Sequence, residues 1–279
     1  MLKLPEVTIC SADSAYVELT AKALTRSQEQ IRFGDAILFS DKFAEGPFRH
    51  VPIKRLASVQ DYSDFCLRDL PGLIATPYVL IVQWDGFVVD PAAWRGIFLK
   101  QDYIGAAWHN FGPGCRVGNG GFSLRSQRLL KALSHFSLVP NYWEDRAICH
   151  LFRPRLEAEF GIKFASEKIA DQFSYEFEFK ESFGFHGVHN LWRYMTDSEL
   201  FETVLLLWTR KLDIWKSLKL ISDAYAGGRI AVARDLYAEL RRAHAISDVA
   251  NAAEGIPRMP STYTSLAELE RHFSGTASD

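Results

Sequence analysis

The first hundred residues alternate between short apolar runs and helical stretches of mixed polarity. Strand patterns lie at 7–13 (VTICSAD), 35–41 (DAILFSD), 50–53 and 78–84 (YVLIVQW), with helical patterns at 15–30 and 62–74. Pro77 follows the second helical pattern, for which Ser63 is the predicted N-cap. This alternation predicts an α/β fold with a Rossmann-like, mixed but mostly parallel sheet flanked by helices.

The chain continues with a glycine-rich loop between strand patterns and then with more helices. We expect strands near 103–108, 122–125 and 162–165, and helices near 126–136 and 141–152. From residue 199 apolar residues recur at helical spacing over two segments, which Gly227 and Gly228 separate. We therefore predict one large domain, 1–196, followed by a C-terminal helical segment, 197–279, with a frayed tail.

The composition narrows the class of protein. A formal net charge of −2 over 279 residues gives no global attraction for nucleic acid. Four cysteines without a Cys-x-x-Cys pair fit reduced, mostly buried thiols. The N-terminus has no signal-peptide pattern, and the longest apolar stretch near a helix, 204–208, is too short to span a bilayer. We expect a soluble, cytoplasmic protein.

Polar side chains end several of the predicted strands, at the sheet edge where α/β folds bind ligands. They are Ser11, Asp13, Ser40, Asp41, Gln83 and Asp85. Asp85 and Gly86 lie between two apolar runs, a pattern that predicts a tight hairpin turn. The carboxylate at the end of a buried strand also predicts a ligand for a divalent cation that touches a diphosphate. The two interpretations are compatible, because a tight turn can present the ligand.

Three further segments carry candidate chemistry. The loop at 117–125 (VGNGGFSLR) has three glycines within four residues, which lets a ligand approach the backbone. Its spacing is neither a dinucleotide fingerprint nor a P-loop. Glu144 and Asp145 are interpreted either as acids favoured at a helix N-terminus or as a general base for an acceptor hydroxyl. His186, between glycines and aromatic residues, is a better candidate metal ligand than His189.

Taken together, these segments resemble a known family. Over about residues 5–190 the chain is similar, in order and in register, to a bacterial glycosyltransferase-like family of poorly defined function, itself similar to GT-A glycosyltransferases. The segments that carry the resemblance are QWDGFVVDP, DYIGAAW, VGNGGFSLRS, WEDRAIC, KFA with a following FSYE, and FGFHG. The resemblance implies a nucleotide-sugar-binding half at about 5–90 and an acceptor-facing half at 91–196.

The resemblance also implies roles for single residues. Asp85 takes the place of the metal-binding aspartate of a DXD motif. The first aspartate of that motif is replaced by Gln83 in this chain. His186 takes the place of the late histidine that completes the metal site. Glu144 or Asp145 takes the place of the catalytic base of an inverting enzyme. The other residues expected at the donor are Ser11, Asp13, Asp41, Trp84, Asn119, Gly120 and Gly121.

We therefore predict a metal-assisted, inverting glycosyltransferase of polysaccharide biosynthesis, with Mn²⁺ or Mg²⁺ as the cofactor. It would move a sugar from a nucleotide-diphosphate donor to a glycan or lipid-linked acceptor. Two alternatives stay open. Gln83 favours a non-catalytic sugar- or nucleotide-binding module. A nucleotidyltransferase would carry a glycine-rich, basic loop after the first strand, which residues 11–16 (SADSAY) lack.

The C-terminal helices allow two interpretations. Basic residues lie among aromatic and apolar ones, as in a helix on a membrane surface near a lipid-linked acceptor. These residues are Arg210, Lys211, Lys216 and Lys219, among Trp208, Trp215 and Leu218. The alternative is a helix that packs on the catalytic domain or on a second copy in a homodimer. Residues 224–240 also resemble a tetratricopeptide-like helix pair, but one pair cannot form an array.

Overall fold

The computed structural model describes residues 1–243 except 109–110, 113–115, 138, 141 and 211. The chain divides into two compact units, Met1–Gly187 and Val188–Asp279. The domain boundary that we predict at residue 196 lies just after the 3-10 segment η5 (Val188–Arg193). In the structure η5 belongs to the second unit, which begins at Val188.

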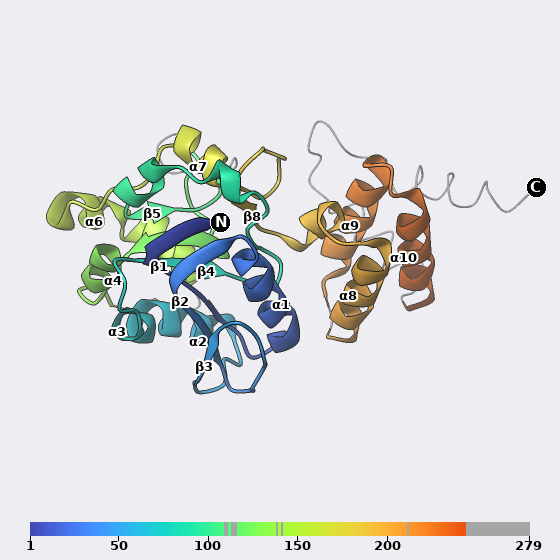
Figure 1. Ribbon diagram of the computed structural model, residues 1–279, viewed down its shortest axis with the longest axis horizontal. Helices are drawn as coiled ribbons and strands as arrows, with labels where there is room; N and C mark the ends of the chain where they lie inside the picture. The colour runs from blue at the N-terminus through green and yellow to red at the C-terminus, as the bar shows by residue number, and fades with distance from the viewer. Residues whose placement is uncertain (109–110, 113–115, 138, 141, 211, 244–279) are drawn as a thin grey trace, which may run out of the picture. The chain divides into compact units, whose positions relative to one another are not determined.

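A six-stranded sheet forms the centre of the first unit, in the order β3-β2-β1-β4-β6-β5 (Figure 1). The strands are β1 (Leu2–Ala12), β2 (Ile31–Ser40), β3 (Arg49–Pro52), β4 (Tyr78–Val82), β5 (Tyr103–Ile104) and β6 (Phe122–Ser126). β1 is parallel to β2 and β4, and β2 to β3, whereas β6 is antiparallel to β4 and β5. The predicted α/β class with a mixed, mostly parallel sheet is confirmed.

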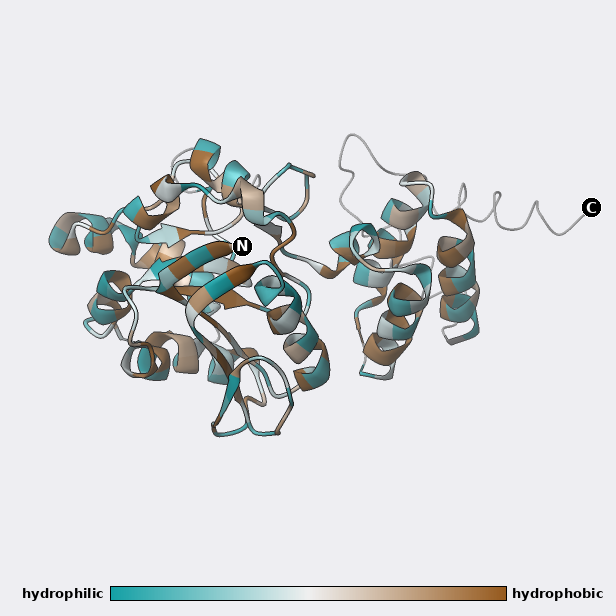
Figure 2. Cartoon of the chain, in the orientation of Figure 1, coloured by the Kyte–Doolittle hydropathy of each residue, from teal (hydrophilic) through white to brown (hydrophobic). Residues whose placement is uncertain are grey.

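The strands are apolar almost throughout because both faces of the sheet are covered. In β4, Leu80 and Val82 belong to the core cluster that contains residues of helix α1 (Val17–Gln28). Val79 and Ile81 belong to the cluster on the other face. All four side chains are at most 2% exposed. The helices around the sheet show both hydrophilic and hydrophobic residues (Figure 2), as expected of elements with one buried face.

Short helices cover the sheet. They are α1, α2 (Val59–Asp64), α3 (Leu70–Leu73), α4 (Gln127–Leu133), α5 (Glu144–Arg146), α6 (Arg153–Phe160) and α7 (Glu167–Phe173), with the 3-10 turns η2 (Pro91–Ala93) and η3 (Gly96–Lys100). A separate parallel pair consists of β7 (Ser174–Tyr175) and β8 (Gly184–Phe185). The strand that we predict at 162–165 is only a single bridge between Phe164 and Tyr103.

Two π turns interrupt the predicted helices. The helix expected at 62–74 is α2, then the π turn η1 (Phe65–Asp69), then α3. Its N-cap is Ser58, whose Oγ accepts a hydrogen bond from Asp61 N at 3.1 Å; the predicted cap, Ser63, is buried inside α2. Helix α5 continues into a second π turn, η4 (Ala147–Leu151), with Phe152 N donating to Ala147 O at 2.8 Å.

The described part of the second unit is helical. It contains η5, α8 (Asp197–Thr209), α9 (Ile214–Ala226) and α10 (Ile230–Ala243). Helix α8 begins with a capping box between Thr196 and Glu199. Gly227, at the end of α9, lies against the ring of Trp192, since a Cβ there would come 2.0 Å from Trp192 Cη2. The predicted C-terminal helical extension is confirmed.

One residue of the predicted membrane-binding face is buried. Lys219 is 4% exposed, and its Nζ donates to Asp223 Oδ2 at 2.7 Å inside the unit. Lys211 lies outside the described residues. No described helix has both the length and the hydropathy that crossing a bilayer would require. Lys219 is therefore not available to lipid headgroups, and peripheral membrane contact stays a prediction.

Candidate active site

A tight turn after β4 carries Gln83 and Asp85. Gly86 N donates to Gln83 O at 3.1 Å, which closes the turn. The segment after β8 lies against it, because Gly187 N donates to Asp85 O at 2.9 Å. A Cβ at Gly86 would lie 3.2 Å from His186 Cδ2, so glycine allows this close approach. The turn thus brings Asp85 to the segment that contains His186.

The His186 ring lies among polar groups. Nε2 is 3.3 Å from Asp85 Oδ1 and 3.2 Å from Gln83 Oε1. Nδ1 is 3.5 Å from Glu176 Oε1 and 2.9 Å from Asn119 Nδ2, a donor that favours an unprotonated Nδ1. Burial also lowers the pKa of His186, but the Asp85 and Glu176 carboxylates outweigh both effects and raise it to about 10. The free ring is therefore a cation at neutral pH.

The glycine-rich loop before β6 lies directly on this ring. Asn119 has a φ of 56°, in the left-handed region. Its Oδ1 accepts hydrogen bonds from Gly121 N at 3.1 Å and Phe122 N at 3.3 Å, which stabilises the turn. A Cβ at Gly121 would come 2.1 Å from His186 Nε2. Only glycine at this position leaves room for the ring.

Asp145 contacts the adjacent glycine of the same loop. Its Oδ2 accepts a hydrogen bond from Gly120 N at 2.9 Å, and its Oδ1 accepts one from Arg146 N at 2.7 Å. The Asp145 side chain is partly exposed, whereas Glu144 is buried. Burial and the neighbouring Glu144 charge raise the pKa of Asp145 to about 6. Asp145 combines access to solvent with a proton affinity near neutrality, as a general base requires.

Arg125, in β6, forms a buried ion pair with Glu144. The Arg125 side chain has no exposed surface, and its Nη2 lies 2.8 Å from Glu144 Oε1. Arg125 Nε donates to Ser123 Oγ at 3.0 Å, and that hydroxyl donates to Gly120 O at 3.0 Å. Glu144 is thereby engaged in the core, which leaves Asp145 as the acid of the pair with access to solvent.

Replacing Arg125 by methionine is expected to lower the free energy of unfolding by about 3–5 kcal/mol, because the Glu144 carboxylate would stay buried without its partner. Urea unfolding measures this difference. The matched control is Arg155→Met on helix α6, whose ion pair with Glu159 is about half exposed. It should leave the free energy of unfolding close to the wild-type value, because an exposed ion pair contributes little. Equal losses in the two variants would contradict the prediction.

Two predicted donor residues near the end of β1 and in the turn after it, Ser11 and Asp13, form hydrogen bonds within the fold. Ser11 Oγ donates to Val82 O at 2.6 Å and is buried between β1 and β4. Asp13 Oδ1 accepts from Tyr16 N at 2.8 Å, and its Oδ2 accepts from Thr20 Oγ1 at 2.7 Å, which shapes the turn before α1. Asp41 follows β2 and is exposed. A donor-binding role for Ser11, Asp13 or Asp41 stays a prediction.

Trp84 forms an aromatic pair beside Asp85. Its ring centroid lies 5.0 Å from that of Tyr16, at an interplanar angle of 46°. The two residues follow the adjacent parallel strands β4 and β1, and both are partly exposed. They form a partly exposed aromatic surface after the carboxyl ends of these two strands, and such a surface suits a sugar or base ring.

The family model described as "Protein of unknown function (DUF5672)" matches residues 46–202, more than half of the chain. The chain belongs to the DUF5672 family. The predicted bacterial glycosyltransferase-like family and a bacterial source stay predictions. No curated protein matches the DUF5672 chain in sequence.

Solved glycosyltransferase structures are among those similar to this DUF5672 chain. One is a glycosyltransferase involved in the glycosylation of the major capsid of PBCV-1 (12% identity, 64% of this chain and 91% of that chain, TM-score 0.41). Another is apo-form GlyE of Streptococcus pneumoniae TIGR4 (14%, 72% and 50%, 0.38). A third is the mannosyltransferase PcManGT from Pyrobaculum calidifontis in complex with GDP-Man and Mn²⁺ (9%, 98% and 84%, 0.39). At these identities and TM-scores the functional case rests on the site itself.

Several contacts of the site come from residues without a role in the sequence-based prediction. They are Tyr16, Ser123, Arg125 and Glu176. Arg125 and Glu176 belong to VGNGGFSLRS and FSYE, two of the segments that carry the family resemblance. The available signal was an arginine beside Phe122 and Leu124 in a strand pattern, because a fully buried arginine requires an acidic or polar partner.

The predicted metal ligands lie together without forming a dedicated metal cage. Among the described residues, no group of three or more His, Cys, Asp or Glu side chains is placed to hold a metal ion. Asp85 Oδ1 and Gln83 Oε1 lie within 3.3 Å of His186 Nε2. Carboxylate, amide and imidazole donors suit Mn²⁺ or Mg²⁺ when diphosphate and water supply the rest of the shell. Asp85, Gln83 and His186 supply only part of such a coordination shell, and the Mn²⁺ or Mg²⁺ cofactor stays a prediction.

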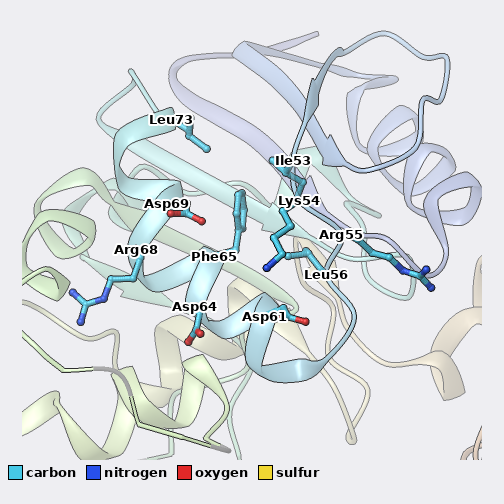
Figure 3. Close-up of a pocket in the computed structure, with 10 residues that line it drawn as sticks. All are labelled: Ile53, Lys54, Arg55, Leu56, Asp61, Asp64, Phe65, Arg68, Asp69 and Leu73. Carbon is cyan, nitrogen blue, oxygen red and sulfur yellow. The ribbon is translucent and has the colours of Figure 1, made fainter.

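A groove of about 630 Å³ lies between the segment after β3 and the helices α2, η1 and α3 (Figure 3). It is lined by Ile53, Lys54, Arg55, Leu56, Asp61, Asp64, Phe65, Arg68, Asp69 and Leu73. The lining combines side chains of both charges with apolar ones such as Phe65 (Figure 3). Asp85, Asp145 and His186 do not line this groove, so the candidate site is not built on it.

Proposed function

We propose that this DUF5672 protein is a glycosyltransferase that moves a sugar, with inversion, from a nucleotide-diphosphate donor to an acceptor hydroxyl. The proposal depends on one observation: two adjacent glycines contact the proposed metal-binding residues and the proposed catalytic base. Gly121 lies on His186, which lies beside Asp85, and Gly120 N donates to Asp145. A proton acceptor and a diphosphate-binding group thus flank one short stretch of backbone.

Asp145 is the proposed base on the acceptor side. It takes the proton of the acceptor hydroxyl while that oxygen bonds to the anomeric carbon and the bond from this carbon to the diphosphate breaks. The Gly120 N–H keeps the carboxylate oriented for the transfer. General-base catalysis of this kind contributes roughly 10²–10⁴-fold to a rate. A carboxylate that activates the acceptor directly favours inversion.

Asp85, Gln83 and His186 form the proposed donor side. Asp85 and His186 would hold Mn²⁺ or Mg²⁺, and a proton and the metal would compete for His186 Nε2. When bound, the cation would offset the charge that develops on the leaving diphosphate. Trp84, packed on Tyr16, would contact a ring of the donor. Asn119 fixes the loop through its hydrogen bonds to two backbone N–H groups.

A thermal-shift series with nucleotide diphosphates and nucleotide sugars, with and without Mn²⁺, tests donor binding. We expect at least one of these ligands to raise the melting temperature, because a ligand at 100 times its Kd adds about 2.7 kcal/mol to the stability of the native state. Asp85→Asn should abolish the Mn²⁺-dependent part of the shift. If no nucleotide ligand raises the melting temperature of the wild type, the proposed function is wrong.

A second candidate function is a non-catalytic module that binds a sugar or nucleotide. Gln83 favours it, because an amide stands where a DXD motif supplies a second carboxylate. Measuring nucleotide-sugar hydrolysis and transfer with added Mn²⁺ separates the two candidates. Turnover supports the transferase, whereas a thermal shift without turnover supports the module.

The acceptor and the cellular setting follow from the same proposal. A glycan or a lipid-linked saccharide is the proposed acceptor, in polysaccharide biosynthesis in the cytoplasm. The proposed donor half is about 5–90 and the acceptor half 91–196. The C-terminal helices are proposed to make a peripheral membrane contact or a homodimer contact. Co-flotation with anionic liposomes and light scattering of the free protein test these two roles separately.

A further inference from the structure

Arg125 links three separate pieces of the candidate site. Its Nη2 lies 2.8 Å from Glu144 Oε1 and 3.4 Å from Gly120 O. Its Nε donates to Ser123 Oγ at 3.0 Å, and the guanidinium lies over the ring of Tyr103 at 5.4 Å. Strand β6, the glycine loop and the start of helix α5 therefore meet on one side chain.

The groups around the guanidinium leave it few ionic partners. Tyr103 contacts it, Tyr62 and Cys66 influence it electrostatically, and burial raises the pKa of all three groups, so all three are neutral near pH 7. The nearby negative charges come from Glu144 and Asp145, of which Glu144 makes the direct contact. The Arg125 guanidinium therefore lies near two adjacent carboxylates and binds the buried one, Glu144.

Gly120 of the glycine loop is packed closely against Arg125 and both acids, Glu144 and Asp145. A Cβ at Gly120 would lie 2.2 Å from Glu144 Oε1 and 2.9 Å from Arg125 Nη2. Asp145 accepts the Gly120 N–H, while Arg125 contacts the carbonyl of the same glycine. Because Glu144 and Asp145 are neighbours in α5, we expect a movement of Glu144 away from Arg125 to displace Asp145 from the Gly120 amide.

We propose that Arg125 is a positioning residue of the site: by holding Glu144 and the Gly120 carbonyl, it keeps the Asp145 carboxylate on the Gly120 amide. Glu144 then serves as the anchor for Arg125 and not as a second base. The catalytic consequence rests on the proposed function, but the positioning of Asp145 can be measured without any substrate.

The test uses the Gly120 amide as a reporter of Asp145. In the full-length protein with ¹⁵N-labelled glycine, the Gly120 resonance should shift with pH, with a midpoint near the Asp145 pKa of about 6. The other titratable groups that influence Asp145 are Glu144, Arg125, Tyr103 and Cys149. Glu144→Gln keeps a neutral hydrogen-bond acceptor for Arg125, so the Gly120 resonance should still shift with pH. The midpoint of that shift should be lower, because the Glu144 charge no longer raises the pKa of Asp145.

The informative variant is Arg125→Met combined with Glu144→Gln, which removes both charges together and so leaves no buried ion unpaired. Its Gly120 resonance should lose the titration, while kcat falls by about 100-fold with an unchanged KM for the donor. Arg125→Lys provides a second variant. It keeps the charge but cannot reach Glu144, Ser123 and the Gly120 carbonyl at once, so it should reduce the same titration.

A normal Gly120 titration in the double variant, or in a folded Arg125→Lys, would overturn the positioning role. A purely structural role for Arg125 predicts that result, with a lowered melting temperature and an unchanged local titration. The expected titration results, combined with no sugar transfer by the wild type, would instead overturn the proposed function and leave the positioning role in place.

Discussion

Asp145→Asn is expected to lower kcat for sugar transfer by roughly 10²–10⁴-fold, the usual contribution of a positioned general base. The asparagine oxygen can still accept the Gly120 N–H, so the loop should keep its conformation, but the amide cannot take a proton. Donor affinity should stay near the wild-type value, because Asp85 and His186 are untouched. Steady-state kinetics and calorimetric donor binding measure the two quantities.

The pH dependence gives an independent test of the same residue. Asp145 acts as a base only when ionised, so the wild-type kcat/KM, which reports the free enzyme, should fall about tenfold per pH unit below the Asp145 pKa of about 6 and level off above it. Asp145→Asn should remove this inflection from its residual activity. A wild-type profile without an inflection between about pH 5 and 7 would argue against Asp145.

The stability of this variant should change in the opposite direction from its activity. The pKa of Asp145 is raised from its ordinary value of 3.8 to about 6 in the folded protein, so the native state binds more protons than the unfolded state between these values. Ionisation of Asp145 therefore costs stability as pH rises from about 4 to 6. At pH 7.5 Asp145→Asn should raise Tm by roughly 2–4 °C, equivalent to about 1 kcal/mol.

A matched control for Asp145→Asn is Asp235→Asn, which removes an exposed carboxylate from helix α10. It should change neither kcat nor Tm, since surface substitutions of this kind stay within about 0.5 kcal/mol. Full transfer activity in Asp145→Asn would exclude Asp145 as the base, whatever the stability data show.

Gly121→Ala is expected to give the second large effect, because the new methyl group would occupy the position of the His186 ring. The added Cβ would lie 2.1 Å from His186 Nε2, 2.4 Å from Cδ2 and 2.7 Å from Cε1, all shorter than real contacts. The ring must move away from Asp85, and a displacement of about 1 Å can cost roughly 100-fold in rate. Overpacking should also lower stability by about 1–3 kcal/mol.

Kinetics, thermal denaturation and the His186 imidazole resonances would measure these changes. The control is Gly96→Ala in η3, where an added Cβ meets no atom within 4 Å. That variant should behave like the wild type in all three measurements. Unchanged kinetics in Gly121→Ala, with displaced His186 resonances, would mean that the ring position does not matter for the reaction.

Much of the sheet was predictable because its strands are buried on both faces. A strand such as β4, with Val79 to Val82 all buried, produces a continuous apolar run that no exposed loop would carry. The Asp-Gly turn after it was predictable for a local reason, since turn chemistry depends on a few consecutive residues. Local patterns of this kind also placed the glycine loop before β6.

The contacts inside the site were harder to predict, because they join residues that are far apart in sequence. Gln83 and His186 are separated by 103 positions, and no local pattern reports that their side chains meet. The ion pair between Arg125 and Glu144 depends on a strand and a helix that pack only in the folded unit. Local patterns proposed Asp85, His186 and the acids Glu144 and Asp145 one by one, and the family resemblance implied that they act together, but neither could distinguish Glu144 from Asp145.

The π turn η4 directly follows the helix α5 that carries Glu144 and Asp145. The number of residues in this turn therefore affects the direction in which the two acidic side chains point. A π turn accommodates one residue more than an α turn, and each residue rotates an α-helix by about 100°. Deleting a single residue between Ala147 and Leu151 would let the helix continue as a regular α-helix. Asp145 would then swing by about 100° around the axis, away from Gly120. A one-residue deletion in η4 would therefore reorient the Asp145 carboxylate without altering any side chain that contacts it.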